Sequence, residues 1–108
     1  MRFSVLLTDD AAHDLEELFD DIDFHDGRGK AIHVLYGIEN ALGSLAETPE
    51  RGAFPKELLA LGLRESREIF FKPYRIVCRI INDKVYVLLI ADDRRDMQGL
   101  LQRRLLGA

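Results

Sequence analysis

The sequence predicts an α+β fold, in which an N-terminal strand and a helical hairpin pack on a small antiparallel sheet and a C-terminal helix follows. Two observations support this prediction. Apolar residues recur at helical spacing in two segments of the N-terminal half. Three short runs rich in β-branched and aromatic residues then follow one another between residues 67 and 91. The length of 108 residues fits a single domain, residues 1–108, with one modest core.

The N-terminal part is predicted to form a strand and then two helices. Residues 2–8, "RFSVLLT", alternate in polarity as a short strand does. Thr8 or Asp9 is expected to cap a first helix, which the glycines of "FHDGRG" end. Gly37 and Gly43 lower the intrinsic stability of the second helix, so close packing against it must compensate. The apolar stripe of this second helix is Ile32, Leu35, Ile38, Leu42 and Leu45.

The C-terminal part is predicted to form three strands and a last helix. An irregular segment, residues 46–63, comes first, and its leucines are expected to pack as one helical turn or an extended cover. Pro73 and an Asn82-Asp83 turn separate the strands, and the third strand is apolar on both faces, as the centre of a sheet is. Asp93 is expected to cap the last helix. The strands are predicted at residues 67–71, 74–81 and 84–91.

Composition and motifs exclude several classes of protein. No run approaches the roughly 18 apolar residues of a membrane-spanning helix, and the N-terminus turns acidic too early for a secretory signal. The single cysteine, Cys78, rules out an internal disulfide, fits a reducing cytoplasm and is expected in the core. The histidines show no metal-ligand spacing, and the sequence carries no phosphate loop or nucleophile elbow. We therefore expect no metal and no cofactor.

Charge is unevenly distributed along the chain. The net charge of −4 argues against a nucleic-acid partner. However, acidic residues dominate up to Gly27, and basic residues dominate from Arg64 onward. The sequence therefore predicts a molecule with an acidic side and a basic side, which are either two solvated faces or binding surfaces.

Two arginines lie on the second of the three predicted strands. Arg75 and Arg79 share one face of this strand, about 13 Å apart at the usual rise per residue. Because the helical hairpin is expected to cover the other face, these arginines should line an open side of the sheet. A guanidinium is always charged and costly to bury alone, so it must meet carboxylates of this chain, such as Glu65 or Glu68, or solvent, or an anion of a partner.

Four further arginines flank the last helix. Arg94 and Arg95 stand where the third strand passes into this helix, and cations at a helix N-terminus oppose the helix dipole. Local stability therefore does not explain them, unless the two preceding aspartates neutralise their charge. Arg103 and Arg104 lie in the last helical turn, where the dipole favours cations.

The order of elements and three segments of the chain together resemble one bacterial family. The segments "LLALGLRESREIFFKPYRIVCRI", "VYVLLIADDRRDM" and "LLQRRLLGA" are similar to the RelE/ParE superfamily of type II toxin–antitoxin toxins, most clearly from Leu58 onward. The resemblance implies a small cytoplasmic toxin with no membrane partner. It also implies a cognate antitoxin, which neutralises the toxin in a hetero-oligomer.

The superfamily divides by target, and the C-terminal part of this chain is more similar to the ParE branch. RelE-like members cleave mRNA on the ribosome with sheet arginines and a C-terminal tyrosine, and the resemblance places Arg75 and Arg94 at those catalytic positions. No tyrosine follows Tyr86, and its expected place falls near Leu100. Arginine stabilises a charged phosphorane but is a poor base, so this departure counts against cleavage. The ending "RRDMQGLLQRRL" is similar to ParE toxins, which poison DNA gyrase.

Three functions remain open on this basis. The leading one is a toxin that binds and poisons gyrase without chemistry of its own. The second is a ribosome-dependent mRNA endoribonuclease, with Glu68 or Asp96 replacing the tyrosine. The third is a family member that binds its antitoxin but is not toxic. For the leading function, the target-binding residues are Arg94, Arg95, Arg103 and Arg104.

All three functions share the antitoxin as a partner. A basic sheet face with apolar rims, among them Leu106, suits an amphipathic segment that carries acids. We expect the strand arginines to be met by carboxylates of the antitoxin. The predicted antitoxin-binding residues are Arg67, Arg75, Val77, Arg79, Ile81 and Leu100.

Overall fold

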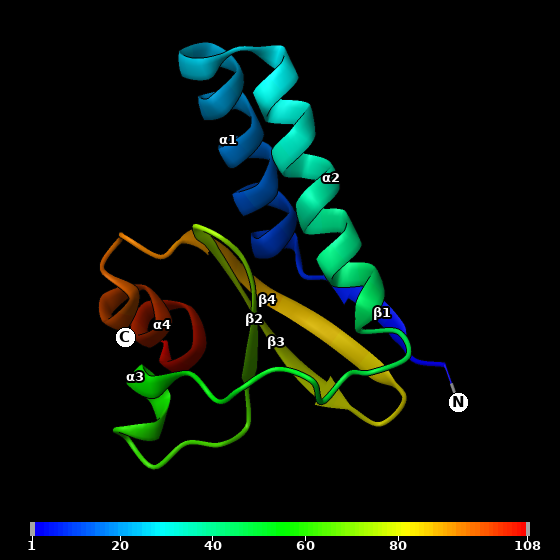
Figure 1. Cartoon of the computed structure of the whole chain (residues 1–108). Coiled ribbons are helices and arrows are strands. Elements are labelled where there is room, and N and C mark those ends of the chain that lie inside the picture. Colours follow the sequence, from blue (N-terminus) through cyan, green and yellow to red (C-terminus); the bar gives the residue numbers. More distant parts are fainter. Residues whose placement is uncertain (1, 108) are drawn as a thin grey trace.

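The chain folds into a four-stranded sheet with helices on both sides. The computed structural model describes residues 2–107. In Figure 1, helices α1 and α2 rise together on one side of the sheet, while α3 and α4 lie together on the other. In chain order the elements are β1 (Ser4–Leu7), α1 (Asp9–Asp26), α2 (Arg28–Ser44), α3 (Lys56–Leu59), β2 (Arg67–Phe71), β3 (Tyr74–Ile81), β4 (Lys84–Asp92) and α4 (Met97–Leu106).

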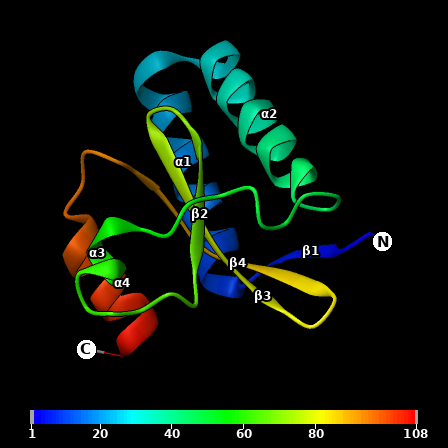
Figure 2. The ribbon, with the colours of Figure 1, turned by 60° about the horizontal axis from the view of Figure 1, so that its bottom comes forward.

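The strands are ordered β1-β4-β3-β2 across the sheet, which confirms the predicted interior position of β4. β2, β3 and β4 form the expected antiparallel meander. Asn82, in the turn between β3 and β4, adopts a left-handed backbone with φ 58, which asparagine tolerates better than most residues. β1 pairs parallel to β4, beside which it lies in Figure 2, so the sheet is antiparallel in three strands and gains one parallel edge strand.

The helical hairpin begins as predicted but turns more tightly than expected. The Thr8 side chain caps α1 and accepts a hydrogen bond from the Ala11 amide at 3.1 Å. α1 continues to Asp26, and Gly27 alone, with φ 98, separates it from α2. The stripe of α2 is shifted from the prediction, since Ile32 is exposed. The buried residues of α2 are Ala31, Val34, Ile38 and Leu42.

Each face of the sheet carries a hydrophobic core. The larger core joins α1 and α2 to one face of β3 and β4, and it includes Ile76 and Cys78. Burial raises the pKa of the Cys78 thiol to about 11, so this cysteine is a core residue, as predicted, and not a nucleophile. The second core lies on the face that we expected to be open. It consists of Leu58, Val77, Leu89, Ala91, Met97 and Leu101, from α3, the sheet and α4.

A bulge in β4 fixes the position of α4. The register shifts between Val77 and Cys78, which leaves Leu88 without a partner on β3. Arg104 of α4 donates to the Leu88 carbonyl at 2.8 Å and to the Asp14 carboxylate at 2.9 Å, and Asp14 also accepts from the Ile90 amide at 3.0 Å. The Arg104–Asp14 ion pair therefore provides hydrogen-bond partners for the Leu88 carbonyl and the Ile90 amide of the bulge, and it links α4 to α1.

The two glycines of α2 differ in what surrounds them, and they allow a matched test of packing. A Cβ at Gly37 would collide with the Phe71 ring, whereas a Cβ at Gly43 would meet open space. We expect Gly37→Ala to lower the free energy of unfolding by about 1–3 kcal/mol through overpacking. Gly43→Ala should raise it by roughly 0.5–1 kcal/mol through helix propensity. Urea unfolding measures both, and equal effects would contradict this view of Gly37.

Candidate functional site

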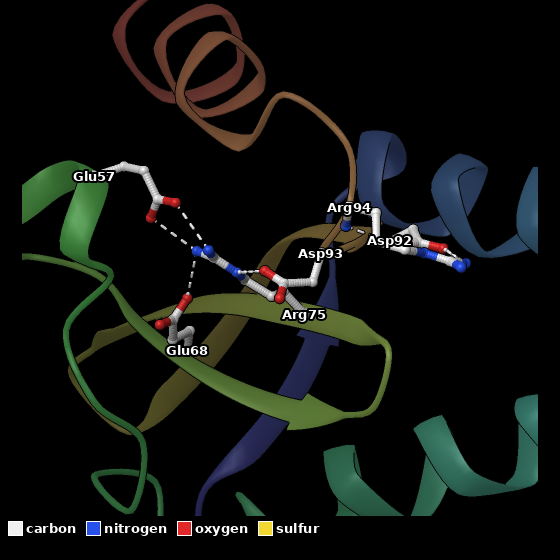
Figure 3. Close-up of polar contacts among 6 residues, drawn as sticks. All are labelled: Glu57, Glu68, Arg75, Asp92, Asp93 and Arg94. Carbon is white, nitrogen blue, oxygen red and sulfur yellow. Dashed lines mark hydrogen bonds and ion pairs between the residues drawn. The ribbon is translucent and has the colours of Figure 1, made fainter.

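A buried arginine with three acidic partners lies at the centre of the second face. Arg75 is only 5% exposed. Its two terminal nitrogens donate to the Glu57 carboxylate at 2.8 Å each, one of them also to Glu68 at 2.9 Å, and its Nε donates to Asp93 at 2.6 Å. Figure 3 shows these carboxylates converging on the guanidinium from α3, β2 and the segment after β4. We call these four residues the Arg75 network.

The Arg75 network corrects the expectation that Arg75 faces an external anion. Three carboxylates surround one guanidinium, so the cluster is acidic and would repel a phosphate. The hydrogen bond from Arg75 lowers the pKa of Glu57. Burial raises the pKa of Glu68, with a further contribution from the neighbouring Glu57 carboxylate. Its partners, Glu57 above all, raise the pKa of Arg75, which stays protonated.

The two glutamates should therefore affect stability with opposite signs. Ionised Glu57 has a lowered folded pKa, so its contribution is present above the unfolded pKa and is lost as pH falls through the folded value. Glu68 has a raised folded pKa, so it lowers the free energy of unfolding as pH rises from the unfolded pKa to the folded pKa, and this loss is complete above the folded value. At neutral pH we expect Glu57→Gln to destabilise the protein and Glu68→Gln to leave it unchanged or more stable. Urea unfolding at neutral and acid pH tests this, and the same sign for both variants would contradict it.

The segment between β4 and α4 places its charged side chains on two sides. Asp93 points to Arg75, while Arg94 donates from Nε to the Asp92 carboxylate at 2.9 Å on the opposite side. Asp96, and not Asp93 as predicted, caps α4 by accepting from the Gly99 amide at 3.1 Å. The prediction failed because the turn after β4 is three residues longer than expected, so the helix cap falls at Asp96 and not at Asp93.

Besides Arg75, two further predicted antitoxin-binding residues do not lie on an open basic face. Arg67 is on the hairpin face, where its guanidinium stacks 4.4 Å from the Phe54 ring centre and donates to the Gly52 carbonyl at 2.9 Å. Val77 is fully buried in the second core. The predicted open basic face of the sheet is therefore wrong for these residues, because Arg67 lies on the other face and α3 and α4 cover much of the face that carries Arg75 and Val77.

What stays open on this face is an apolar groove with basic and acidic sides. It has a volume of about 450 Å³ and lies between α4 and the C-terminal end of β3. Arg79 and Ile81, both predicted, line it, and Arg79 forms a loose 3.6 Å ion pair with Glu65. Leu100 instead packs beside the second core. The apolar lining of this groove consists of Leu58, Leu63, Ile81, Leu88, Leu105 and Leu106.

The four arginines that flank α4 have different environments. Arg94 is 78% exposed even though Asp92 holds it, and Arg95 and Arg103 are also exposed. Arg104 is largely covered, and the two carboxylates of α1 that contact it raise its pKa. Three of these arginines are therefore available to a partner, while Arg104 joins α4 to the rest of the fold.

Sequence patterns could have found part of the Arg75 network. Glu68 lies on the strand next to Arg75, two positions from its direct neighbour Phe70 and on the same face, so strand register points to it. Glu57 lies in a four-residue helix within an irregular segment, where periodicity gives no signal. No group of three or more His, Cys, Asp or Glu side chains within residues 2–107 is arranged to hold a metal ion. In the same part of the chain, no helix is long and apolar enough to cross a membrane.

The chain is similar to several solved toxin–antitoxin structures. A chain of the chromosomal ParDE TA system from P. aeruginosa has 20% sequence identity and a TM-score of 0.70, over 84% of this chain and 96% of that one. The toxin–antitoxin complex RelBE2 from Mycobacterium tuberculosis has 23% identity and a TM-score of 0.56, over 85% and 92%. A free E. coli RelE variant has 15% identity and a TM-score of 0.63, over 93% of both chains. At these identities the likeness shows the fold alone.

A family model assigns the chain more narrowly than the structures do. No curated protein sequence matches the chain significantly. The model of the "ParE toxin of type II toxin-antitoxin system, parDE" matches residues 5–97, which extend from β1 to the start of α4. This confirms the resemblance that the sequence indicated and its ParE-like branch. The chain belongs to the ParE toxin family of type II toxin–antitoxin systems.

Proposed function

We propose that this toxin arrests growth by binding DNA gyrase and does not cleave RNA. The observation that carries this proposal is the Arg75 network. A RelE-like mechanism would need Arg75 and Arg94 to hold the scissile phosphate together, but Arg75 already meets three carboxylates of its own chain. Arg94 also points to the other side of the segment after β4. Together with the missing C-terminal tyrosine, this geometry supports a toxin that acts through binding.

The target-binding surface in this proposal consists of the exposed arginines around α4. Arg94 and Arg95 lie in the turn before the helix, and Arg103 lies near its end. Arginines present several donors in a fixed plane and suit acidic or phosphate-bearing surfaces. Arg104 belongs to the predicted set, but its contacts with Asp14 and Leu88 favour a structural role.

A supercoiling assay with a charge-matched control tests this function. We expect the purified chain to inhibit gyrase, so that relaxed DNA accumulates, and we expect Arg94→Ala with Arg95→Ala to abolish inhibition. The control replaces Arg2 and Lys30 with alanine, which removes the same charge from exposed sites far from α4. Undisturbed supercoiling at doses that stop growth would refute gyrase as the target. If the chain does not arrest growth at all, toxicity itself is refuted.

We also propose that the cognate antitoxin occupies the groove lined by Arg79 and Ile81. The groove has an apolar lining, and Ile81 and Leu106 at its sides are among the exposed large apolar residues. Arg79 is about half exposed and only loosely paired. An amphipathic segment with leucine-like and acidic side chains fits both features.

Charge reversal tests this antitoxin site. We expect Arg79→Glu to weaken antitoxin binding roughly tenfold or more, since it places like charges opposite each other. Lys30→Glu, at the far end of the helical hairpin, is the matched control and should bind normally. Isothermal titration calorimetry measures both. A separate apolar groove lies on the helical hairpin and is lined by Leu15 and Leu35. An unchanged affinity for Arg79→Glu, or cross-links to this other groove, would place the antitoxin elsewhere.

A further inference from the structure

We propose that Asp93 is a positioning residue, which fixes the direction in which Arg94 and Arg95 face the target. The inference rests on the proposed function of these two arginines. Asp93 is held at two points: its carboxylate accepts from Arg75 Nε at 2.6 Å, and its amide donates to the Pro73 carbonyl at 2.8 Å. Both partners belong to the β2–β3 hairpin, so Asp93 ties the segment after β4 to the neighbouring part of the sheet.

Arg75 is a rigid anchor for this tie. Its two terminal nitrogens are held by Glu57 and Glu68, and its side chain is nearly inaccessible. The side chain of Asp93, in contrast, is 48% exposed. Asp93 therefore connects a surface turn to a fixed point in the interior, and removing it leaves Arg75 with two carboxylate partners.

The turn itself directs the next two arginines outward. The Arg94 amide and Nε both donate to one oxygen of Asp92 at 2.9 Å, and the Arg95 amide donates to the Asp92 carbonyl at 3.1 Å. Asp92 and Arg94 lie on the side of the turn facing α1, opposite to Asp93 (Figure 3). Asp93 and Arg94 are adjacent in the chain and point to opposite sides of the turn, so the inward contact of Asp93 helps to hold Arg94 outward.

The functional consequence is preorganisation of a cationic pair. A turn held in one conformation loses less conformational entropy when it docks, so its arginines bind more tightly than the same arginines on a mobile turn. Without the charge-assisted bond to Arg75, the turn would sample other conformations. The arginines would keep their exposure and charge but lose their fixed direction.

The test compares Asp93→Ala with Asp83→Ala. Asp83 lies in the turn at the other end of β4, and its side chain forms an ion pair with Lys84, so its removal changes the charge equally without touching the network. The readouts are growth arrest, supercoiling inhibition, antitoxin affinity and hydrogen exchange of the Arg94 and Arg95 amides. Antitoxin affinity and the melting temperature report whether the variant stays folded.

We expect Asp93→Ala to inhibit supercoiling and arrest growth with a potency that is roughly tenfold or more lower. Its Arg94 and Arg95 amides should exchange faster by a similar factor. Antitoxin affinity should stay within about twofold of the wild type, since the groove is not altered. Asp83→Ala should match the wild type in all four readouts. Unchanged exchange in Asp93→Ala, or full potency despite faster exchange, would overturn the positioning role. Wild-type protein that stops growth without affecting supercoiling would instead refute the gyrase proposal alone.

Discussion

Replacing Arg75 with methionine is expected to lower the free energy of unfolding by about 3–5 kcal/mol, because it leaves buried carboxylates without a counter-charge. The side chains of Glu57 and Glu68 are both about nine-tenths buried. An ionised carboxylate only accepts hydrogen bonds, so each of them needs a donor such as Arg75. A domain of this size has a total stability of roughly 5–15 kcal/mol, so the variant should unfold early in urea or fail to fold. Urea unfolding monitored by circular dichroism gives the difference.

Two further variants serve as controls for Arg75→Met. Arg79→Met makes the same substitution four residues further along the same face of β3, where the arginine is about half exposed, and should shift the free energy of unfolding by less than about 1 kcal/mol. Replacing Arg75, Glu57 and Glu68 together with apolar residues should recover much of the lost stability, since the uncompensated charges are then absent. If Arg75→Met were as stable as Arg79→Met, Arg75 would not be the internal ion-pair centre described above.

Replacing Leu101 with alanine is expected to cost about 2–5 kcal/mol, the range for large-to-small changes in a packed core. Leu101 is 0% exposed and joins α4 to Val77 and Leu89 of the sheet in the second core. Because α4 is only ten residues long, it depends on this packing and on Arg104 for its position. The cavity should therefore loosen α4 as well as lower global stability.

Leu100 is the control for this second substitution. It precedes Leu101 on the same helix and is only partly buried beside the second core. Leu100→Ala should cost about 1 kcal/mol or less, in proportion to the smaller apolar area that it buries. Calorimetric melting of both variants measures the difference, and equal losses would show that α4 is not anchored through Leu101.

The sequence predicted the sheet well because its strands have clear boundaries. Pro73 and the Asn82-Asp83 turn separate β2, β3 and β4, and each of these three strands matches its prediction within one residue. The helical hairpin was also predicted, since Thr8 supplies a cap and the apolar spacing is regular. Local chemistry determines these elements, so a single sequence is enough to find them.

The environment of the arginines could not be predicted in the same way. Arg75 meets Glu57, which is 18 residues away in a helix of a single turn, and only the tertiary path of residues 46–63 brings the two together. The same applies to Arg104, whose partner Asp14 is 90 residues away. Alternation places a side chain on a face of the sheet, but it does not show what covers that face.

We propose that this toxin binds its target and leaves RNA intact. The most direct measurement maps mRNA ends on ribosomes incubated with the purified chain, at the concentration that stops supercoiling or growth. We expect the message in the ribosomal A site to remain uncut and translation to proceed. Cleavage at A-site codons that is lost in Arg94→Ala would contradict the claim and establish a RelE-like nuclease.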